Sequence, residues 1–140
     1  MTICYFDSSA LVKTLLDEPE SEVARLLWAG ADVLITSVVA HAEVRAALAM
    51  ASRLGRISPS DQTQAKAYWE RMWRSVSIVE ASRSVVERAG SLAEHHNLRG
   101  FDAIHLASAS IVPTNLGIVA TWDRRLSDAA VQMGYSVTPG

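Results

Sequence analysis

Four acidic residues occupy positions from which carboxylates could act together on a substrate: Asp7, Glu43, Asp102 and Asp123. Asp7 directly follows a short apolar run, and Asp123 follows another, separated from it by Trp122. In an open parallel sheet, ligands bind outside the carboxyl ends of the strands. Clustered carboxylates with no balancing lysine repel one another unless a cation lies among them, and Mg²⁺ or Mn²⁺ suits such oxygen ligands. A site of this kind can activate water and stabilise charge on a scissile phosphate.

Each acid also has a purely structural interpretation. Asp7, Asp102 and Asp123 stand where helices are expected to begin, and aspartate is a favoured N-cap residue. Glu43 differs, because its helical neighbours three and four positions away are apolar or small. A carboxylate there is costly to bury alone, so the alternatives are an ion pair with an arginine such as Arg45, contact with solvent at a helix edge, and a metal site.

The histidines and glycines add no second candidate chemistry. No His and Cys spacing typical of zinc is present, so we interpret His41 and His105 as structural residues. His95 and His96 are expected at a solvated helix end. No glycine-rich loop followed by lysine occurs, so nucleotide hydrolysis has no support.

Short apolar runs alternate with helical patterns along the chain. The expected strands cover residues 2–6, 33–36, 76–79, 117–121 and, as a possible edge strand, 135–138. The expected helices cover about 8–16, 20–29, 38–54 with Ser37 as a possible cap, 59–74, 82–96, 101–110 and 124–133. Parallel neighbours require crossover connections, so this alternation predicts an α/β fold with a central parallel sheet of four to five strands, covered on both faces.

Length and composition indicate one domain spanning residues 1–140, because nearly half of the residues are apolar and no linker or repeat interrupts them. The net charge of -2 provides no overall attraction for polyanions, so a nucleic-acid partner would need a local basic patch or metal ions. The single cysteine, Cys4, cannot form an internal disulfide. With no apolar run near the roughly 20 residues of a membrane helix, we expect a soluble, cytoplasmic protein.

Four segments resemble, in order, those of the PIN-domain family, specifically its VapC-like toxins. The segments are Tyr5 to Lys13, Thr36-Ser37 with Ala42 to Val44, Leu98 to Ala107, and Thr121 to Asp123 with Leu126. The resemblance spans nearly the whole chain. It implies a three-layer α/β/α sandwich whose acidic pocket binds Mg²⁺, or Mn²⁺, and cleaves RNA.

The resemblance also implies roles for particular residues. Asp7 and Asp102 match the positions most regularly assigned to the metal, and Glu43 and Asp123 match acids that complete the catalytic pocket.

Two hydroxyl residues, Ser9 and Thr121, match positions beside the pocket that hold water or a carboxylate in place. Trp122 departs from the family pattern, because many relatives carry a small residue there; it would alter substrate access or pack against a helix. Asp128 is expected to point along the last helix, away from the pocket.

Proteins of this kind commonly form homodimers and are inhibited by a small antitoxin that lies across a groove between the early helices. The helix expected over 59–74 mixes basic and aromatic residues and suits such a contact, or it is an ordinary amphipathic helix; these residues are Lys66, Arg71, Arg74, Tyr68, Trp69, Met72 and Trp73. Five further arginines could contact RNA phosphates: Arg53, Arg56, Arg99, Arg124 and Arg125.

The expected function is therefore that of a type II toxin, an Mg²⁺-dependent endoribonuclease that uses a metal-activated water. The alternative is a degenerate PIN module that only binds antitoxin and operator DNA. A phosphoryl-transfer protein with Asp7 as nucleophile fits poorly, because a haloacid-dehalogenase-like motif would need a second aspartate at the position of Ser9.

Overall fold

The computed structural model describes residues 1–140. The strands are β1 (Ile3–Phe6), β2 (Val33–Ser37), β3 (Ser77–Val79), β4 (Gly117–Ala120) and β5 (Ser136–Thr138). The helices are α1 (Ser8–Leu15), α2 (Ser21–Gly30), α3 (Ala40–Arg53), α4 (Pro59–Ser75), α5 (Arg83–His96), α6 (Gly100–Ala109) and α7 (Arg124–Gln132). Every predicted element is present, and most boundaries differ by one or two residues, as is usual for frayed ends.

All five strands are parallel, in the order β3-β2-β1-β4-β5. The chain builds outward from β1 in one direction through β2 and β3, and in the other through β4 and β5. The order therefore reverses between β1 and β4, where Phe6 pairs with Ala120. In open sheets of this type, the crevice at the carboxyl ends of such a strand pair is where ligands bind.

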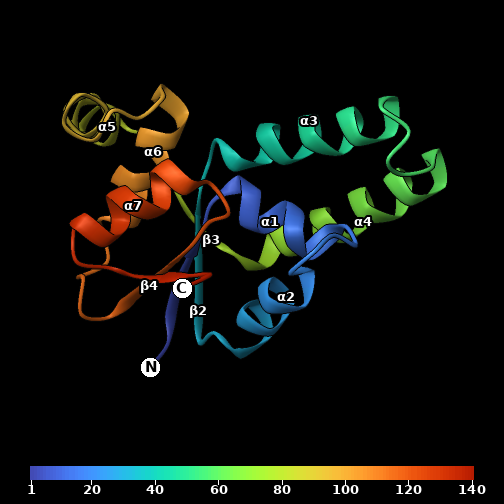
Figure 1. Ribbon diagram of the computed structural model, residues 1–140, viewed down its shortest axis with the longest axis horizontal. Coiled ribbons are helices and arrows are strands. Elements are labelled where there is room, and N and C mark those ends of the chain that lie inside the picture. The colour runs from blue at the N-terminus through green and yellow to red at the C-terminus, as the bar shows by residue number, and fades with distance from the viewer.

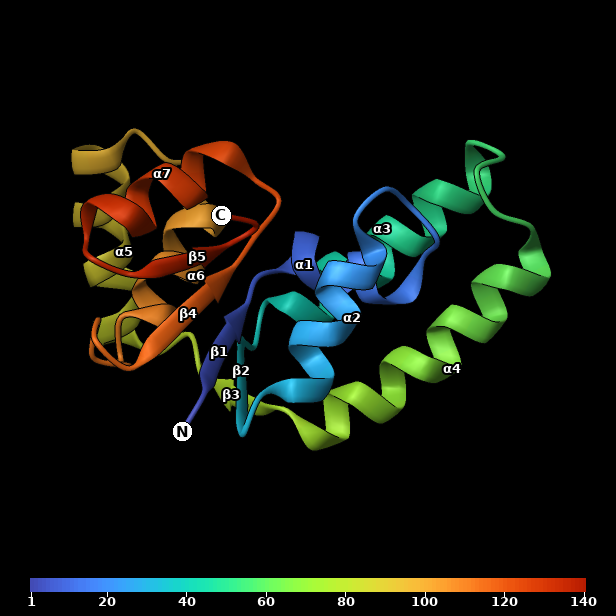
Figure 2. The same cartoon turned by 60° about the horizontal axis from the view of Figure 1, so that its bottom comes forward.

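Helices cover both faces of the sheet, which confirms the predicted three-layer sandwich (Figures 1 and 2). Successive residues of a strand point to opposite faces. Tyr5 and Val119 belong to a core cluster formed with α5, α6 and α7. Phe6 and Ala120 belong to a second cluster formed with α1 to α4. The strands are therefore buried on both sides, as their unbroken apolar runs predict.

Helix α3 and helix α4 form an arm that extends away from the sheet, joined at its tip by residues 54–58 (Figures 1 and 2). Gly55, with a φ of 72°, follows α3 in the left-handed conformation that glycine favours. Ser58 and Asp61 form a reciprocal capping box at the start of α4. The expectation that Ser37 caps α3 is wrong, because Ser37 ends β2 and the cap position is Val39. No helix combines the length and the apolar character that a membrane crossing requires.

Candidate active site

Asp7 lies at the carboxyl end of β1, where the strand order reverses, and it is the N-cap of α1. Its side chain is only 3% exposed. Its Oδ1 accepts hydrogen bonds from the Ser9 hydroxyl (2.7 Å) and the Ala10 N–H (2.9 Å), and its Oδ2 accepts one from the Thr121 hydroxyl (2.5 Å). A carboxylate buried and bonded in this way is held in one orientation, which also makes it unsuited to act as a nucleophile.

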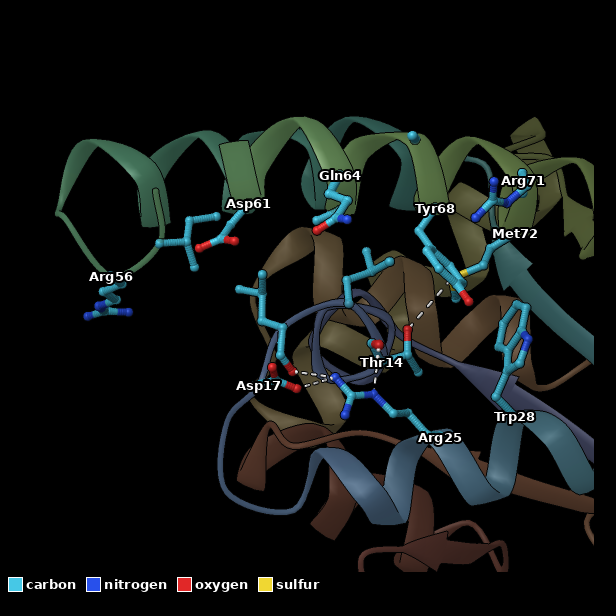
Figure 3. A pocket seen from close by; sticks show the side chains of 15 residues that line it. Thr14, Asp17, Arg25, Trp28, Arg56, Asp61, Gln64, Tyr68, Arg71 and Met72 are labelled. Carbon is cyan, nitrogen blue, oxygen red and sulfur yellow. Dashed lines mark hydrogen bonds and ion pairs between the residues drawn. The ribbon is translucent and has the colours of Figure 1, made fainter. Parts of the chain in front are cut away.

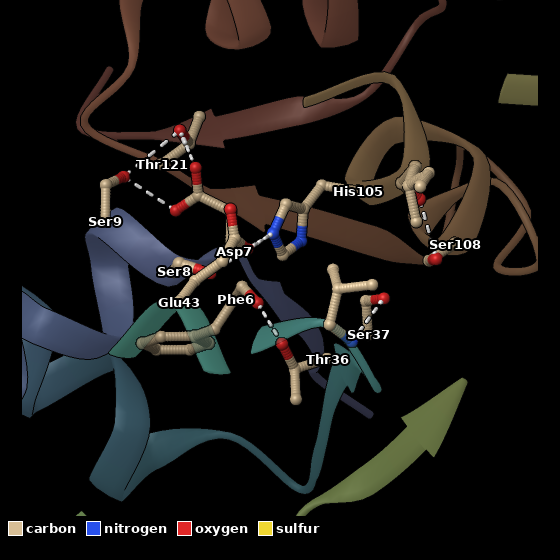
Figure 4. A network of polar contacts seen from close by, with 12 residues as sticks. Phe6, Asp7, Ser8, Ser9, Thr36, Ser37, Glu43, His105, Ser108 and Thr121 are labelled. Atoms are coloured by element: carbon tan, nitrogen blue, oxygen red, sulfur yellow. Dashed lines mark hydrogen bonds and ion pairs between the residues drawn. The ribbon is translucent and has the colours of Figure 1, made fainter. Parts of the chain in front are cut away.

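The two predicted pocket hydroxyls join the β1 end to the β4 end (Figure 4). Thr121 donates to Asp7 and accepts a hydrogen bond from the Asp123 N–H (3.0 Å). Ser9 donates to Asp7 and accepts from the Trp122 N–H (2.8 Å). Asp123, in turn, caps α7 by accepting from the Leu126 N–H. The hydroxyls therefore link the segment that carries Asp7 to the segment that carries Asp123.

We expect Thr121→Val to destabilise the protein by about 1–3 kcal/mol, because the substitution keeps the side-chain volume but leaves the buried Asp7 carboxylate short of a donor. Thr138→Val, in neighbouring strand β5, is the matched control, since the Thr138 hydroxyl forms no hydrogen bond within the protein. Urea denaturation measures both free energies of unfolding. Equal stabilities of the two variants would contradict the assigned role of Thr121.

Glu43 lies in the first turn of α3, and its Oε1 accepts hydrogen bonds from two side chains. The Ser8 hydroxyl donates at 2.6 Å, and the His105 Nε2 lies at 2.7 Å (Figure 4). The suggested ion pair with an arginine such as Arg45 is wrong, because Arg45 instead pairs with Glu70 of α4. The prediction that His105 is only structural missed this contact with a candidate active-site acid.

Asp102 lies in the first turn of α6 and accepts no hydrogen bond, so its N-cap interpretation is wrong; the cap position is Arg99. Burial raises the pKa of Asp102, and the negative charge of Asp123 raises it further, followed by those of Asp7 and Glu43. His105 opposes these effects when its ring is protonated. The four carboxylates therefore lie within electrostatic range of one another.

The other two shifted acids respond to different surroundings. Burial raises the pKa of Asp7 above its ordinary value, although His105 and the bonds from Thr121 and Ser9 oppose the shift. Burial would also raise the pKa of Glu43, but hydrogen bonds from His105 and Ser8 outweigh it and hold that pKa below the ordinary value. Hydrogen bonding thus favours the ionised form of Glu43, whereas burial disfavours the ionised form of Asp7.

The predicted residues lie at one end of the sheet, but their side chains do not form a complete set of metal ligands. No three His, Cys, Asp or Glu side chains are arranged to hold one metal ion. No lysine or arginine pairs with Asp7, Asp102 or Asp123 either. The site therefore contains carboxylates that lack a basic partner, and the common metal site stays a prediction.

The neighbouring aromatic residues are mainly structural. Trp122 packs against the α1 to α4 cluster, and its indole N–H approaches the Glu20 carboxylate at 3.4 Å. In α4, Trp69 is fully buried, as the interpretation of an amphipathic helix predicts, and its indole N–H donates a hydrogen bond to Nδ1 of His41. Tyr68, by contrast, is exposed, with the Arg71 guanidinium over its ring.

Tyr68 and Arg71 belong to a groove of about 1020 Å³ on the α1 to α4 side of the molecule (Figure 3). We call it the α4 groove; its wall also includes Thr14 to Asp17 of α1 and the following turn, Arg25 and Trp28 of α2, and Arg56 and Ile57 of the arm's tip. None of the four candidate acids lines it. The eight residues of α1 span about 12 Å, so the groove lies about one short helix away from Asp7.

The chain is similar to known proteins over nearly its whole length. The profile of the PIN domain family matches residues 4–132. Ribonuclease VapC45 of Mycobacterium tuberculosis (strain CDC 1551 / Oshkosh) is 45% identical over 139 residues, covering 99% of this chain and 96% of that protein.

Solved structures show the same fold at low sequence identity. The crystal structure of VapC20 from Mycobacterium tuberculosis, a sarcin–ricin loop cleaving toxin, aligns with a TM-score of 0.67 at 19% identity, covering 90% of this chain and 94% of that one. A toxin–antitoxin complex from Klebsiella pneumoniae aligns with a TM-score of 0.63 at 18% identity, covering 89% of each chain. From the family profile and the 45% identity together, we conclude that this chain belongs to the PIN domain family.

Proposed function

We propose that this protein is the toxin of a type II toxin–antitoxin pair, an endoribonuclease whose hydrolysis depends on Mg²⁺ or Mn²⁺. The main support for the proposal is a set of four carboxylates at the β1/β4 crevice, none of which pairs with a lysine or arginine: Asp7, Glu43, Asp102 and Asp123. The relative named ribonuclease VapC45 supports RNA as the substrate, because its similarity extends over the whole site.

The donor set suits Mg²⁺ even though no three side chains enclose an ion. Mg²⁺ keeps several waters and is usually bound by one or two carboxylates together with substrate phosphates, not by an all-protein cage. Asp102 is the most available ligand because it accepts no hydrogen bond, and Oδ2 of Asp7 accepts only one. When bound, the ion would neutralise charge on the phosphate and lower the pKa of a water molecule.

The protein's own groups supply orientation and charge around that centre. Ser9 and Thr121 keep the Asp7 carboxylate in place. Arg99 directly precedes α6, and Arg124 is the first residue of α7; both are exposed. They therefore flank the acids and could contact the RNA backbone. Arg53 and Arg56, predicted for the same role, lie instead at the far end of the α3–α4 arm.

The experiment that tests the proposal is incubation of the purified chain with total cellular RNA and Mg²⁺, followed by sequencing of the new RNA ends. We expect cleavage at a restricted set of sites. RNA left intact with both Mg²⁺ and Mn²⁺ would favour the alternative function, a degenerate PIN module that only binds antitoxin and operator DNA.

We further propose that the α4 groove receives a segment of the antitoxin. The groove combines exposed aromatic surface with two arginines, Arg56 and Arg71, that form no ion pair within the chain. Its other charged residues are Asp17, which pairs with Arg25, and Asp61, which caps α4. Such a surface favours a segment that presents apolar side chains next to acidic ones. A few residues beyond the groove would bring the same segment to Asp7, about 12 Å away along α1.

We expect Arg71→Glu to weaken antitoxin binding by about tenfold or more, because the reversed charge would repel an acidic segment and would no longer lie over Tyr68. Titration calorimetry with the cognate antitoxin measures the dissociation constant. Arg83→Glu, at the start of α5 on the opposite layer, is the matched control. Equal antitoxin affinities of the two variants would exclude the α4 groove as the antitoxin-binding site. Light scattering on the chain alone tests the predicted homodimer.

A further inference from the structure

A line of three buried or half-buried side chains connects the core to the acidic pocket. Tyr5 of β1 and His105 of α6 are each only 2% exposed. The Tyr5 hydroxyl lies 2.7 Å from Nδ1 of His105, and Nε2 of the same ring lies 2.7 Å from Oε1 of Glu43. Glu43 belongs to α3 in one helical layer, and His105 belongs to α6 in the other. This contact therefore ties the two layers together at the pocket.

The chemistry of the groups determines the direction of these hydrogen bonds. An ionised carboxylate only accepts, so Nε2 of His105 must carry a proton and donate to Glu43. In the neutral ring, Nδ1 is then an acceptor, and the Tyr5 hydroxyl donates to it. Tyr5 thereby selects the imidazole tautomer that faces Glu43.

The arrangement leaves the two oxygens of Glu43 in different situations. Oε1 is engaged by His105 and by the Ser8 hydroxyl. Oε2 has no donor within the protein. A glutamate has three rotatable side-chain bonds, and a free one would sample many orientations.

We propose that His105 is a positioning residue for Glu43: its Nε2–H holds Oε1 so that Oε2 remains directed to the divalent cation. This inference rests on the proposed function. Hydrogen bonds that orient a metal ligand are typically worth about 10–100-fold in metal affinity.

The test compares two amide substitutions by calorimetric titration of the full chain with Mn²⁺. Glutamine carries its amide one carbon further from the backbone than asparagine does, so only His105→Gln can replace the Nε2 donor. We expect His105→Asn to weaken Mn²⁺ binding by about 10–100-fold, and His105→Gln to restore most of the loss. Both variants lose the same ring packing, so stability alone does not separate them. His96→Asn, at the end of α5, is the control.

A double-substitution cycle separates positioning from a general structural effect. In the Glu43→Gln background, His105→Asn should cause no further loss of Mn²⁺ affinity, because the residue it positions has already lost its charge. An equal loss in both backgrounds, or no rescue by glutamine, would overturn the inference. Nitrogen NMR of the unmodified protein gives a check that needs no variant, since the ring must be the Nε2–H tautomer. An Nδ1–H tautomer would also overturn it.

The outcomes distinguish this inference from the proposed function. If His105→Asn does not change Mn²⁺ binding, the positioning role is overturned, while the proposed nuclease function is unaffected. If His105→Asn weakens Mn²⁺ binding but the wild-type protein does not cleave RNA, the positioning role is supported and the nuclease function is excluded. A wild-type chain that binds no Mn²⁺ at millimolar concentration overturns both.

Discussion

Replacing Asp102 by asparagine is expected to reduce RNA cleavage by about 10²-fold or more, because it removes one charge from the site where the phosphate must be stabilised. The side chain keeps its shape, and Asp102 accepts no hydrogen bond that the change would break. Gel or sequencing assays of RNA cleavage under single-turnover conditions measure the rate. The control is Asp128→Asn, because Asp128 is an exposed acid of α7 outside the cluster.

The same variant should be at least as stable as the wild type at neutral pH. Burial and the charge of Asp123 raise the pKa of Asp102 in the folded protein above its ordinary value of 3.8. The stabilising contribution of Asp102 is therefore fully present below about pH 3.8 and is lost as the pH rises through the folded pKa. At neutral pH the ionised carboxylate opposes folding, and asparagine removes that effect. Cleavage at the parental rate, or loss of activity only through unfolding, would contradict the catalytic role.

Removing divalent cations should abolish cleavage altogether. We expect EDTA to stop the reaction, and excess Mg²⁺ or Mn²⁺ to restore it. The reason is that no lysine or arginine pairs with the four carboxylates, so a cation is needed to offset their repulsion of the RNA phosphate. Asp7 is unsuited to act as a nucleophile in place of a metal-activated water, since it is buried and both of its oxygens accept hydrogen bonds. Cleavage that continues in EDTA would exclude the metal-dependent mechanism.

Metal binding should also be visible without RNA. A cation present at 100 times its dissociation constant stabilises the folded state by about 2.7 kcal/mol, or roughly 5–10 °C in Tm for a domain of this size. Thermal unfolding with and without Mg²⁺ measures the shift. The shift should be much smaller in Asp102→Asn and unchanged in Asp128→Asn. If the two variants respond equally to Mg²⁺, the ion binds elsewhere.

Local sequence patterns were sufficient to predict the helices and strands and the fold class. Strands with unbroken apolar runs and helices with cap residues follow from interactions within a few positions of each residue, as at Ser58 with Asp61 and at Asp123 with Leu126. The predicted alternation then required a parallel sheet covered on both sides. The placement of acids after strands one and four also followed from the sequence, because parallel strands end at the same edge.

The hydrogen-bond partners within the site could not be predicted in this way. His105 and Glu43 are 62 positions apart, and Tyr5 and His105 are 100 positions apart. Whether such residues meet depends on the strand order β3-β2-β1-β4-β5, and no local signal encodes that order. For this reason the sequence suggested an arginine partner for Glu43, which the structure contradicts, and gave no indication that His105 contacts this acid.

The amino-acid sequence by itself determined the elements, the fold class and the positions of the carboxylates along the chain, because these follow from short-range propensity and periodicity. Only the tertiary structure decided which oxygens remain available, which hydroxyls join Asp7 to the β4 segment, and where the α4 groove lies. Those features depend on side chains from separate layers meeting at atomic distances. A register change of one residue would turn Asp7 away from Thr121, since neighbouring strand positions point to opposite faces.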